Sequence, residues 1–229
     1  MYKYMLWDID GTVLNFEKSQ NAAIRTLFLK YKIGECTDEM LRVYTNINHK
    51  YWEALERGEK TKSEILVERF IDFFSLYNIN VNLAEIFNDD YQVTLGDYAS
   101  FENDAEEMLN YFKGNCKLIA VTNGTKIAQT KKLKTTGLDK IFDSVYISED
   151  VGYEKPNVRY FEHVFSEENI KNKNEVIIIG DSLTSDILGG NNIGIDTCWY
   201  NPLNKQKDKN VIVKYEISSL DKLKKIVEI

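Results

Sequence analysis

The sequence predicts an α/β protein, a doubly wound Rossmann-like parallel sheet, with a helical segment inserted after the first strand. Five short apolar runs lack the alternation of a half-solvated strand, and continuous runs are typical of parallel strands covered on both faces. Helical patterns separate these runs, as in a doubly wound sheet. One connection is far longer than a simple crossover requires, which indicates an insertion.

The predicted strands follow one another along the chain with helices between most of them. They are Tyr4–Ile9, Lys117–Val121, Ser144–Ile147, Val176–Ile179 and Asp196–Trp199. Asn103 and Glu106 have capping-box spacing, which predicts the start of a helix there. Residues 126–136 have a helical pattern that stops at Gly137, and residues 185–191 predict a short helix after the fourth strand.

The long connection, residues 10–116, contains a segment with a purely helical pattern. Apolar and aromatic side chains recur in it at helical spacing, as expected for a small core, and Thr61 with Glu64 forms a capping box. We therefore expect residues 16–96 to form a helical cap, and residues 1–15 with 97–229 to form the α/β core. Because open α/β folds bind ligands at the carboxyl edge of the sheet, a cap inserted there is placed to act as a lid.

Composition narrows the possible partners. The 229 residues carry 29 basic and 36 acidic side chains, a net charge of −7, which argues against a nucleic-acid polymer or an anionic membrane as the main partner. Cys36, Cys116 and Cys198 are widely spaced, so neither a disulfide framework nor a cysteine zinc site is expected. The N-terminus lacks a signal-peptide pattern and no apolar run could span a membrane, so we expect a cytoplasmic protein. The oligomeric state is left open.

Two acidic side chains follow the first predicted strand. Asp8 and Asp10 can both point into one cleft once the chain leaves the strand, and Gly11 permits the sharp turn. Such a pair suits metal binding, or the paired roles of nucleophile and acid. Taken alone, the pattern is also compatible with a solvated turn.

Polar groups also follow the second and third predicted strands. Thr122 precedes Asn123 and Gly124, and a hydroxyl followed by turn-forming residues can hold an anion. Lys155 follows the third strand. Each of these features alone is more often a turn or a solvated side chain, so neither decides a function by itself.

Two more acids follow the fourth predicted strand, because Asp181 closes it and Asp186 is five residues further on. Carboxylates are ligands that Mg²⁺ prefers. The carboxyl ends of parallel strands meet at one edge of the sheet, so all these groups are expected at a single site beneath the lid. An acid pair, a hydroxyl, a cation and a further acid at one site indicate phosphoryl transfer.

Four ordered motifs carry a family resemblance: DIDGT, VTNG, GYEKP and IIIGDSLTSD. As a set they resemble the motifs of the haloacid dehalogenase (HAD) superfamily, and the helical insert resembles its type 1 cap. More narrowly, residues 44–48, 148–156 and 180–202 resemble pyrimidine 5′-nucleotidases of the YjjG/YfnB type. In that superfamily phosphatases carry the second acid, here Asp10, and dehalogenases lack it.

The resemblance implies a Mg²⁺-dependent phosphomonoesterase. It assigns Asp8 as the nucleophile that forms an aspartyl-phosphate and Asp10 as the acid and base, protonated at the start because neighbouring negative charge surrounds it. The resemblance also assigns roles to the other motif residues. Thr122 and Lys155 take part in catalysis, and phosphate is bound by Gly11, Thr122, Asn123, Gly124 and Lys155. Mg²⁺ is held by Asp8, the Asp10 carbonyl and Asp181, while Asp186 orients Lys155 or a bound water.

The implied substrate is a pyrimidine nucleoside 5′-monophosphate, with phosphoglycolate and sugar phosphates as alternatives. Since the core motifs contact only phosphate, the cap must select the leaving group. The candidate selecting residues are Asn15, Phe16, Asn46, Asn48 and Trp52. Asn could hydrogen-bond a pyrimidine and an aromatic ring could stack on it. The alternative interpretation, that Trp52 belongs to the cap core, is favoured for that residue.

Three other functions compete with this one. Gly180-Asp181-Ser182-Leu183 spells the motif of GDSL esterases, but both histidines, His49 and His163, precede Ser182, whereas that family places its His near the C-terminus. A signalling receiver also combines acids, a Thr and a Lys, but has no long helical insert. A binding protein with an inactive site would not need the intact acid pair.

Overall fold

The computed structural model describes residues 1–207 and 210–227 of the chain. Its centre is a six-stranded parallel sheet in the order β3-β2-β1-β4-β5-β6. The strands are β1 (Tyr4–Trp7), β2 (Lys117–Thr122), β3 (Ser144–Ile147), β4 (Val176–Gly180), β5 (Asp196–Tyr200) and β6 (Tyr215–Ile217). Tyr4 pairs with Lys117 on one side and Val176 on the other, so β1 lies in the middle of the sheet. The predicted doubly wound parallel sheet is confirmed.

Helices account for most of the remaining chain. The first four after β1 are α1 (Phe16–Lys30), α2 (Asp38–Glu56), α3 (Lys62–Leu76) and α4 (Ala84–Asp97). The others are α5 (Ala105–Phe112), α6 (Lys126–Thr136), α7 (Ser148–Val151), α8 (Val158–Glu167) and α9 (Leu188–Ile193). Short 3₁₀ turns cover Val81–Leu83, Leu138–Lys140, Lys173–Glu175 and Leu220–Lys225, and a π-helical turn covers Leu183–Ile187.

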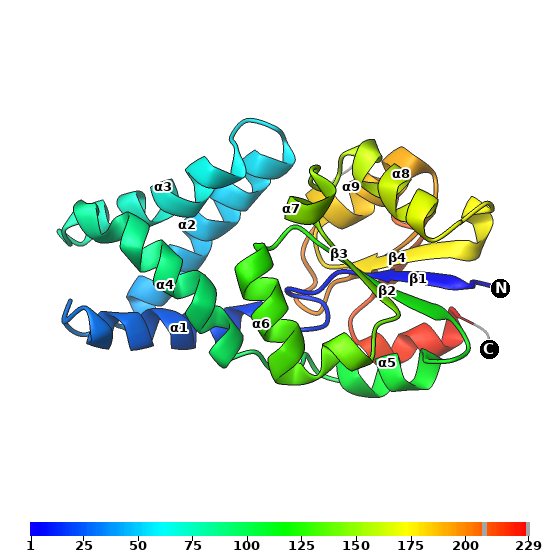
Figure 1. Ribbon diagram of the computed structural model, residues 1–229, viewed down its shortest axis with the longest axis horizontal. Coiled ribbons are helices and arrows are strands. Elements are labelled where there is room, and N and C mark those ends of the chain that lie inside the picture. The colour runs from blue at the N-terminus through cyan, green and yellow to red at the C-terminus, as the bar shows by residue number, and fades with distance from the viewer. Residues whose placement is uncertain (208–209, 228–229) are drawn as a thin grey trace.

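The sheet is buried on both faces. In Figure 1, α8 and α9 lie above it, while α5 and the C-terminal 3₁₀ turn lie below. Alternate side chains of β1 pack on opposite faces of the sheet. Met5 and Trp7 pack into the apolar cluster that contains α5 residues, and Leu6 packs into the cluster that contains α8 residues. This double coverage explains why the strands are continuously apolar in sequence.

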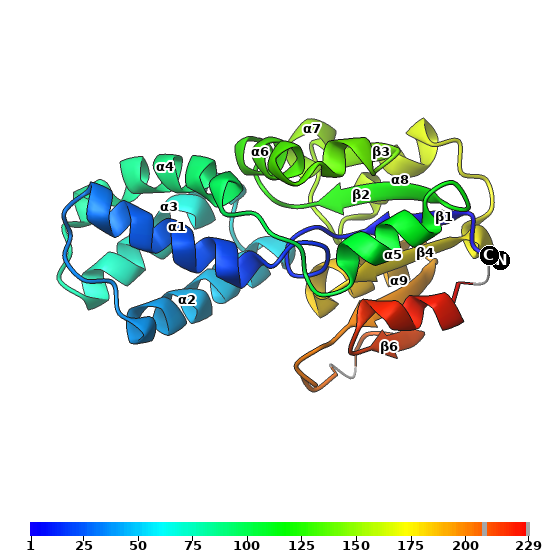
Figure 2. The ribbon, with the colours of Figure 1, turned by 90° about the horizontal axis from the view of Figure 1, so that it is seen from below.

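Helices α1 to α4 form a separate group beyond the carboxyl edge of the sheet (Figures 1 and 2). Their aromatic side chains are buried against one another, as the helical spacing predicts; the cluster includes Phe28, Tyr44, Phe70, Phe73, Phe74, Phe87 and Tyr91. Ala128 of α6 joins the same cluster, so the group packs on the helix that follows β2. A division of the chain at residues 16 and 96 stays a prediction.

Two predicted helix boundaries are confirmed. Thr61 and Glu64 form the expected capping box, in which each side chain bonds to the other's backbone N–H. Helix α6 ends at Gly137, whose φ of 75° is the left-handed conformation that glycine adopts without strain.

Other boundaries were predicted wrongly. The residue before α5 is Asp104, with a φ of 65° and no side-chain capping bond, so Asn103 does not cap the helix. The helix predicted over residues 185–191 is a π-helical turn followed by α9. Strand β1 ends at Trp7 rather than Ile9. Strand β6 was not predicted, because this edge strand has three residues and only Ile217 is buried.

Two further features of the described residues concern the cysteines and the apolar length of the helices. The three cysteines are buried and free, with no disulfide among them. Across residues 1–207 and 210–227, no helix is both long enough and apolar enough to cross a membrane.

Candidate active site

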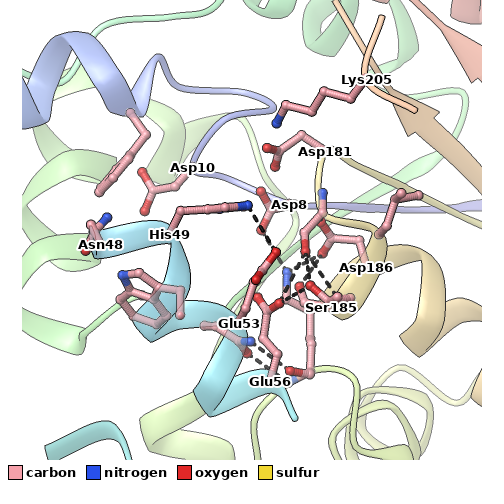
Figure 3. A pocket seen from close by; sticks show the side chains of 18 of the residues that line it. Asp8, Asp10, Asn48, His49, Glu53, Glu56, Asp181, Ser185, Asp186 and Lys205 are labelled. Atoms are coloured by element: carbon pink, nitrogen blue, oxygen red, sulfur yellow. Dashed lines mark hydrogen bonds and ion pairs between the residues drawn. The ribbon is translucent and has the colours of Figure 1, made fainter. Parts of the chain in front are cut away.

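The polar groups that follow four different strands meet at one cavity. Asp8 follows β1, Thr122 ends β2, Lys155 lies beyond β3, and Asp181 follows β4. All four line a cavity of about 620 Å³ that also has walls from α1 and α2. Figure 3 shows the carboxylates of Asp8 and Asp181 pointing into this cavity. The proximity of these residues, predicted because each follows a parallel strand, is therefore confirmed.

Lys155 is the buried cation of the site. Its Nζ donates to Asp8 Oδ1 at 2.7 Å, to Asp186 Oδ1 at 2.6 Å and to the Val121 carbonyl at 2.8 Å. Burial opposes its charge, but the carboxylates of Asp186 and Asp8 outweigh burial and raise the pKa of Lys155 above its usual range. The side chain is only 1% exposed, so the ammonium holds Asp8 in a fixed position.

Asn123 fixes the backbone of Lys155. Its Oδ1 accepts the Lys155 N–H at 2.8 Å, and its Nδ2 donates to the Lys155 carbonyl at 2.9 Å. The side chain of Asn123 is therefore occupied in positioning the lysine, a role that the sequence analysis missed. Next to it, the Thr122 hydroxyl accepts the N–H of Gly124 at 3.1 Å, so the three residues form one ordered turn.

Three carboxylates form a cluster that could hold a cation. Asp8, Asp181 and Asp186 each offer an oxygen, and these oxygens lie within 4.8 Å of one another. Burial, with Asp186 and Asp181 adding repulsion, raises the pKa of Asp8 well above its usual range; burial and the charge of Asp186 raise the pKa of Asp181 to about 7. Buried, mutually repelling oxygen ligands with too little positive charge fit a divalent cation.

Asp186 differs from the other two members of this cluster. Both of its oxygens already have protein donors, since Oδ1 accepts from Lys155 and Oδ2 accepts the Ser182 N–H at 3.2 Å. It lies in the π-helical turn, a distortion that is frequent at functional sites. Its direct contact with Lys155 agrees with the predicted positioning role, whereas Asp8 and Asp181 have oxygens more available to a metal.

The side chain of Asp10 lies outside the carboxylate cluster. Its Oδ1 is 2.6 Å from Lys132 Nζ, and its Oδ2 accepts from Gln129 Nε2 at 2.6 Å. The expectation that negative charge surrounds Asp10 is therefore wrong, because its immediate partners are a cation and an amide donor from α6. The motif predicts where the backbone of Asp10 lies, but α6 decides where its side chain points.

Gly11 is required by a close approach. Its φ is 92°, and a Cβ at this position would lie 2.8 Å from Asp181 Oδ2. We expect Gly11→Ala to lower kcat/KM about tenfold to a hundredfold, because the methyl group displaces Asp181 and small displacements at a site cost that much. Phosphate release from an aryl phosphate measures this.

Gly114→Ala is the matched control for backbone strain. Gly114 has a similar φ of 84°, but a Cβ there would meet nothing within 4 Å. Equal activity of the two variants, with equal melting temperatures, would show that the contact with Asp181 has no functional importance.

Of the five residues predicted to select the substrate, three line the cavity and two do not. Phe16, Asn48 and Trp52 line the cavity. Asn15 instead caps α1, accepting the Lys18 N–H at 2.9 Å, and Asn46 is exposed outside the cavity; both predictions are wrong in placement. Trp52 belongs to none of the buried apolar clusters in the described chain, so its interpretation as a cap-core residue is also wrong.

Two charged residues of this cavity were not among the predicted site residues. Glu56 lies one turn after Trp52 on α2, bonds to Thr184 across the cavity, and has a pKa that burial raises to about 8. Lys205 faces Asp181 (Figure 3) and opposes the rise in that acid's pKa. Lys205 follows β5 at the carboxyl edge, so the rule that located the other groups could have located it too.

The esterase alternative has no structural support. The Ser182 hydroxyl contacts Thr184 at 3.2 Å and Glu56 at 3.4 Å and accepts the Ser185 N–H. Among the residues that the structure describes, no histidine bonds to it, and His49 pairs instead with Glu53 at 3.1 Å. Ser182 therefore lacks the base that a serine esterase needs.

Comparison with known proteins decides the family. The model of haloacid dehalogenase-like hydrolases matches residues 5–200. The chain belongs to this HAD family. It is therefore a hydrolase, and its four motifs and its parallel sheet agree with this family.

Three curated relatives of this HAD hydrolase match over nearly their full length. YfnB of Bacillus subtilis, named a HAD-hydrolase, is 34% identical over 100% of the chain and 96% of the relative. PynA of Streptococcus pneumoniae is 31% identical over 97% of the chain and 93% of the relative, and YjjG of Escherichia coli is 28% identical over 99% and 98%. Both of these are named pyrimidine 5′-nucleotidases.

A solved structure supports the fold assignment. The crystal structure of YfnB superposes with a TM-score of 0.93 and covers 100% of this chain and 99% of the other. That structure is described as bound to magnesium and as revealing interdomain movement. A magnesium site in a relative with this fold agrees with the carboxylate cluster found here.

Proposed function

We propose that this HAD hydrolase is a Mg²⁺-dependent phosphomonoesterase that converts pyrimidine nucleoside 5′-monophosphates to nucleoside and phosphate. The observation that carries the reaction class is Asp8, held by Lys155 beside Asp181, with Asp10 two residues further on. The names of PynA and YjjG support the substrate class. Small phosphate esters, rather than polymers or membranes, fit a cavity of about 620 Å³.

Asp8 and Asp10 perform the covalent chemistry in this proposal. Asp8 Oδ attacks phosphorus, and the bond from phosphorus to the ester oxygen breaks as Asp10 protonates that oxygen. Asp10 then takes a proton from water as the water oxygen attacks phosphorus. The bond from phosphorus to Asp8 Oδ breaks, which releases phosphate and restores the Asp8 carboxylate. Since both oxygens of Asp10 accept hydrogen bonds, from Gln129 and Lys132, its carboxylate must leave these partners and take up a proton from water. Its side chain must then turn toward the ester to donate that proton.

The phosphate would be held by groups that surround Asp8. Lys155 supplies positive charge, and Gly11 lets the chain pass close to Asp181. The Thr122 hydroxyl and the Asn123 N–H supply donors. The Gly124 N–H already donates to the Thr122 oxygen, which leaves the hydroxyl hydrogen of Thr122 for the phosphate. Donors fixed before the reaction stabilise the developing charge without reorganising.

Mg²⁺ fits the oxygen ligands of Asp8 and Asp181, with the Asp10 carbonyl as a third. When bound, the ion would neutralise phosphate charge beside the carboxylates. Residues 16–96 would form the cap, and residues 1–15 with 97–229 the catalytic core. The proposal includes a cytoplasmic location, which the three free cysteines support.

A panel of phosphate esters tests this function. It should contain UMP, CMP, AMP, phosphoglycolate, a hexose phosphate and p-nitrophenyl phosphate, all with Mg²⁺ present. We expect hydrolysis of the aryl phosphate and the highest kcat/KM on UMP or CMP. A higher kcat/KM on phosphoglycolate or the hexose phosphate would contradict the nucleotidase assignment while leaving the phosphatase assignment intact.

A further inference from the structure

A line of buried polar side chains crosses the α1–α2 wall of the cavity. Arg69 Nη1 donates to Asn48 Oδ1 at 2.6 Å, and Asn48 Nδ2 donates to Gln20 Oε1 at 3.2 Å. Gln20 Nε2 then donates to the Thr45 hydroxyl at 2.7 Å, which donates to the Leu41 carbonyl at 3.0 Å. Arg69 and Gln20 are each 1% exposed and Asn48 is 5% exposed. Asn48, Gln20 and Thr45 all line the cavity.

The direction of this line is determined by chemistry. A guanidinium can only donate hydrogen bonds, so the Asn48 atom that faces Arg69 must be the oxygen. The nitrogen of Asn48 then faces Gln20, which must turn its own oxygen to meet it. The carbonyl of Leu41 can only accept, so both ends of the line enforce the same orientation of the two amides.

This orientation leaves hydrogen-bond donors at the cavity wall. Each amide nitrogen carries two hydrogens, and within residues 1–207 and 210–227 each has one acceptor, Gln20 Oε1 or Thr45 Oγ1. The two amide oxygens already accept hydrogen bonds, Asn48 Oδ1 from Arg69 and Gln20 Oε1 from Asn48. Figure 3 shows the Asn48 nitrogen on the side of its amide nearer to Asp10, and the carboxylate cluster across the cavity from it. A buried donor without an acceptor is costly, which points to an acceptor on the ligand.

Arg69 is an unusual residue in this position. Its hydrogen-bond acceptors among the described residues are neutral: the amides of Asn48 and Asn88 and the carbonyl of Leu66. Its guanidinium also packs on the rings of Phe70 and Tyr91, 5.1 and 5.3 Å from their centroids. Burying a cation without a carboxylate costs free energy. A neutral amide in place of Arg69 could donate or accept, so the side-chain amide of Asn48 could exchange its oxygen and nitrogen. A side chain that can only donate prevents this exchange.

We infer that Asn48 and Gln20 bind the carbonyl oxygen of the substrate's base through their N–H groups, and that Arg69 is the positioning residue that keeps those donors directed at the cavity. This inference rests on the proposed function and names its specificity site. Every natural pyrimidine base has a carbonyl at C2, whereas adenine has none. Phe16 and Trp52 line the same cavity and offer rings for a planar base. The wall therefore favours pyrimidine over adenine nucleotides.

Asn48→Asp is the direct test. The variant keeps an oxygen for Arg69, with which it forms an ion pair, but it loses the N–H of the wall. We expect kcat/KM for UMP to fall at least about tenfold, mainly through KM, because a hydrogen bond is replaced by repulsion between oxygens. Hydrolysis of p-nitrophenyl phosphate, which has no base, should stay within about twofold, and so should hydrolysis of AMP. Asn46→Ala, exposed on the same helix, is the matched control and should change neither.

A pair of substitutions tests the positioning role. Arg69→Lys keeps a pure donor and should retain the preference for UMP over AMP, whereas Arg69→Gln should lose it. Inhibition by uridine provides a second readout: its inhibition constant should rise about tenfold in Asn48→Asp and Arg69→Gln and not in Arg69→Lys. If Arg69→Gln does not fold, uridine inhibition of Asn48→Asp decides.

These experiments distinguish a failure of the proposed base-binding site from a failure of the proposed phosphatase function. Equal losses on UMP and p-nitrophenyl phosphate, or no loss on either, would overturn the specificity site while leaving the phosphatase in place. A wild-type protein that hydrolyses p-nitrophenyl phosphate but prefers AMP to UMP would also overturn it. A wild-type protein that releases phosphate from none of these esters would overturn the proposed function itself, and this inference with it.

Discussion

Asp8→Asn is expected to abolish phosphate release, with kcat falling by at least about 10⁴-fold. A neutral amide is a poor nucleophile toward phosphorus and removes the charge that Lys155 Nζ contacts at 2.7 Å. Phosphate release from p-nitrophenyl phosphate and from UMP measures the loss. The effect should be equal on both substrates, because Asp8 acts on the phosphorus and not on the leaving group.

Asp10→Asn is expected to cause a smaller loss of activity than Asp8→Asn. Loss of proton transfer to the leaving group typically costs ~10²–10⁴-fold, and the loss should be greater for UMP than for the more acidic p-nitrophenol. Melting curves of both variants should show a folded protein, since neither side chain belongs to an apolar core. Full activity of Asp8→Asn would exclude Asp8 as the nucleophile.

Removal of divalent cations is expected to silence the enzyme. Asp8, Asp181 and Asp186 offer clustered oxygens, and Lys155 alone does not balance them together with a phosphate dianion. Dialysis against EDTA should reduce phosphate release to background, and added Mg²⁺ should restore it. Ca²⁺ should restore it poorly, because its coordination shell is larger and less regular.

The metal prediction also has a binding readout. Titration of Mg²⁺ into the chelated protein should raise the melting temperature, because an ion that binds only the folded state stabilises it. The stabilisation should be lost in Asp181→Asn. Undiminished phosphate release after exhaustive dialysis against chelator would contradict the proposed use of Mg²⁺.

The sheet could be predicted from sequence because its strands are buried on both faces. Met5, Leu6 and Trp7 are all apolar since they feed two cores, and that continuous pattern is visible without a structure. Edge strand β6 has no such pattern. The start of α5 was also misplaced, because the chain enters the helix through Asp104 in a left-handed conformation that the capping-box pattern does not contain.

The site was predictable where backbone topology determines it. Residues after parallel strands must share one edge, so Asp8, Thr122, Lys155 and Asp181 were expected together and lie together. Side-chain direction follows no such rule. Asp10 turns toward α6 because Lys132 and Gln129 attract it, and no local pattern reports a contact across more than 100 residues.

The cap residues were the least predictable part. Helical spacing shows which face of α2 is apolar, but not which part of that helix meets the core. Trp52 and Glu56 reach the cavity while Asn46, on the same helix, does not. The Arg69–Asn48 contact links two helices through buried polar groups, and hydrophobic periodicity gives no information about such pairs.

Acid quenching during turnover, followed by mass spectrometry of the digested protein, tests the central claim most directly. With Mg²⁺ and excess p-nitrophenyl phosphate, the peptide that contains Asp8 should carry a phosphoryl group that is labile to hydroxylamine, as an acyl phosphate is. The adduct should be absent in Asp8→Asn and should accumulate when Asp10→Asn slows its hydrolysis more than its formation. A phosphoryl group on Ser182, or turnover of the wild-type enzyme with no adduct on the Asp8 peptide at any quench time, would contradict the covalent mechanism.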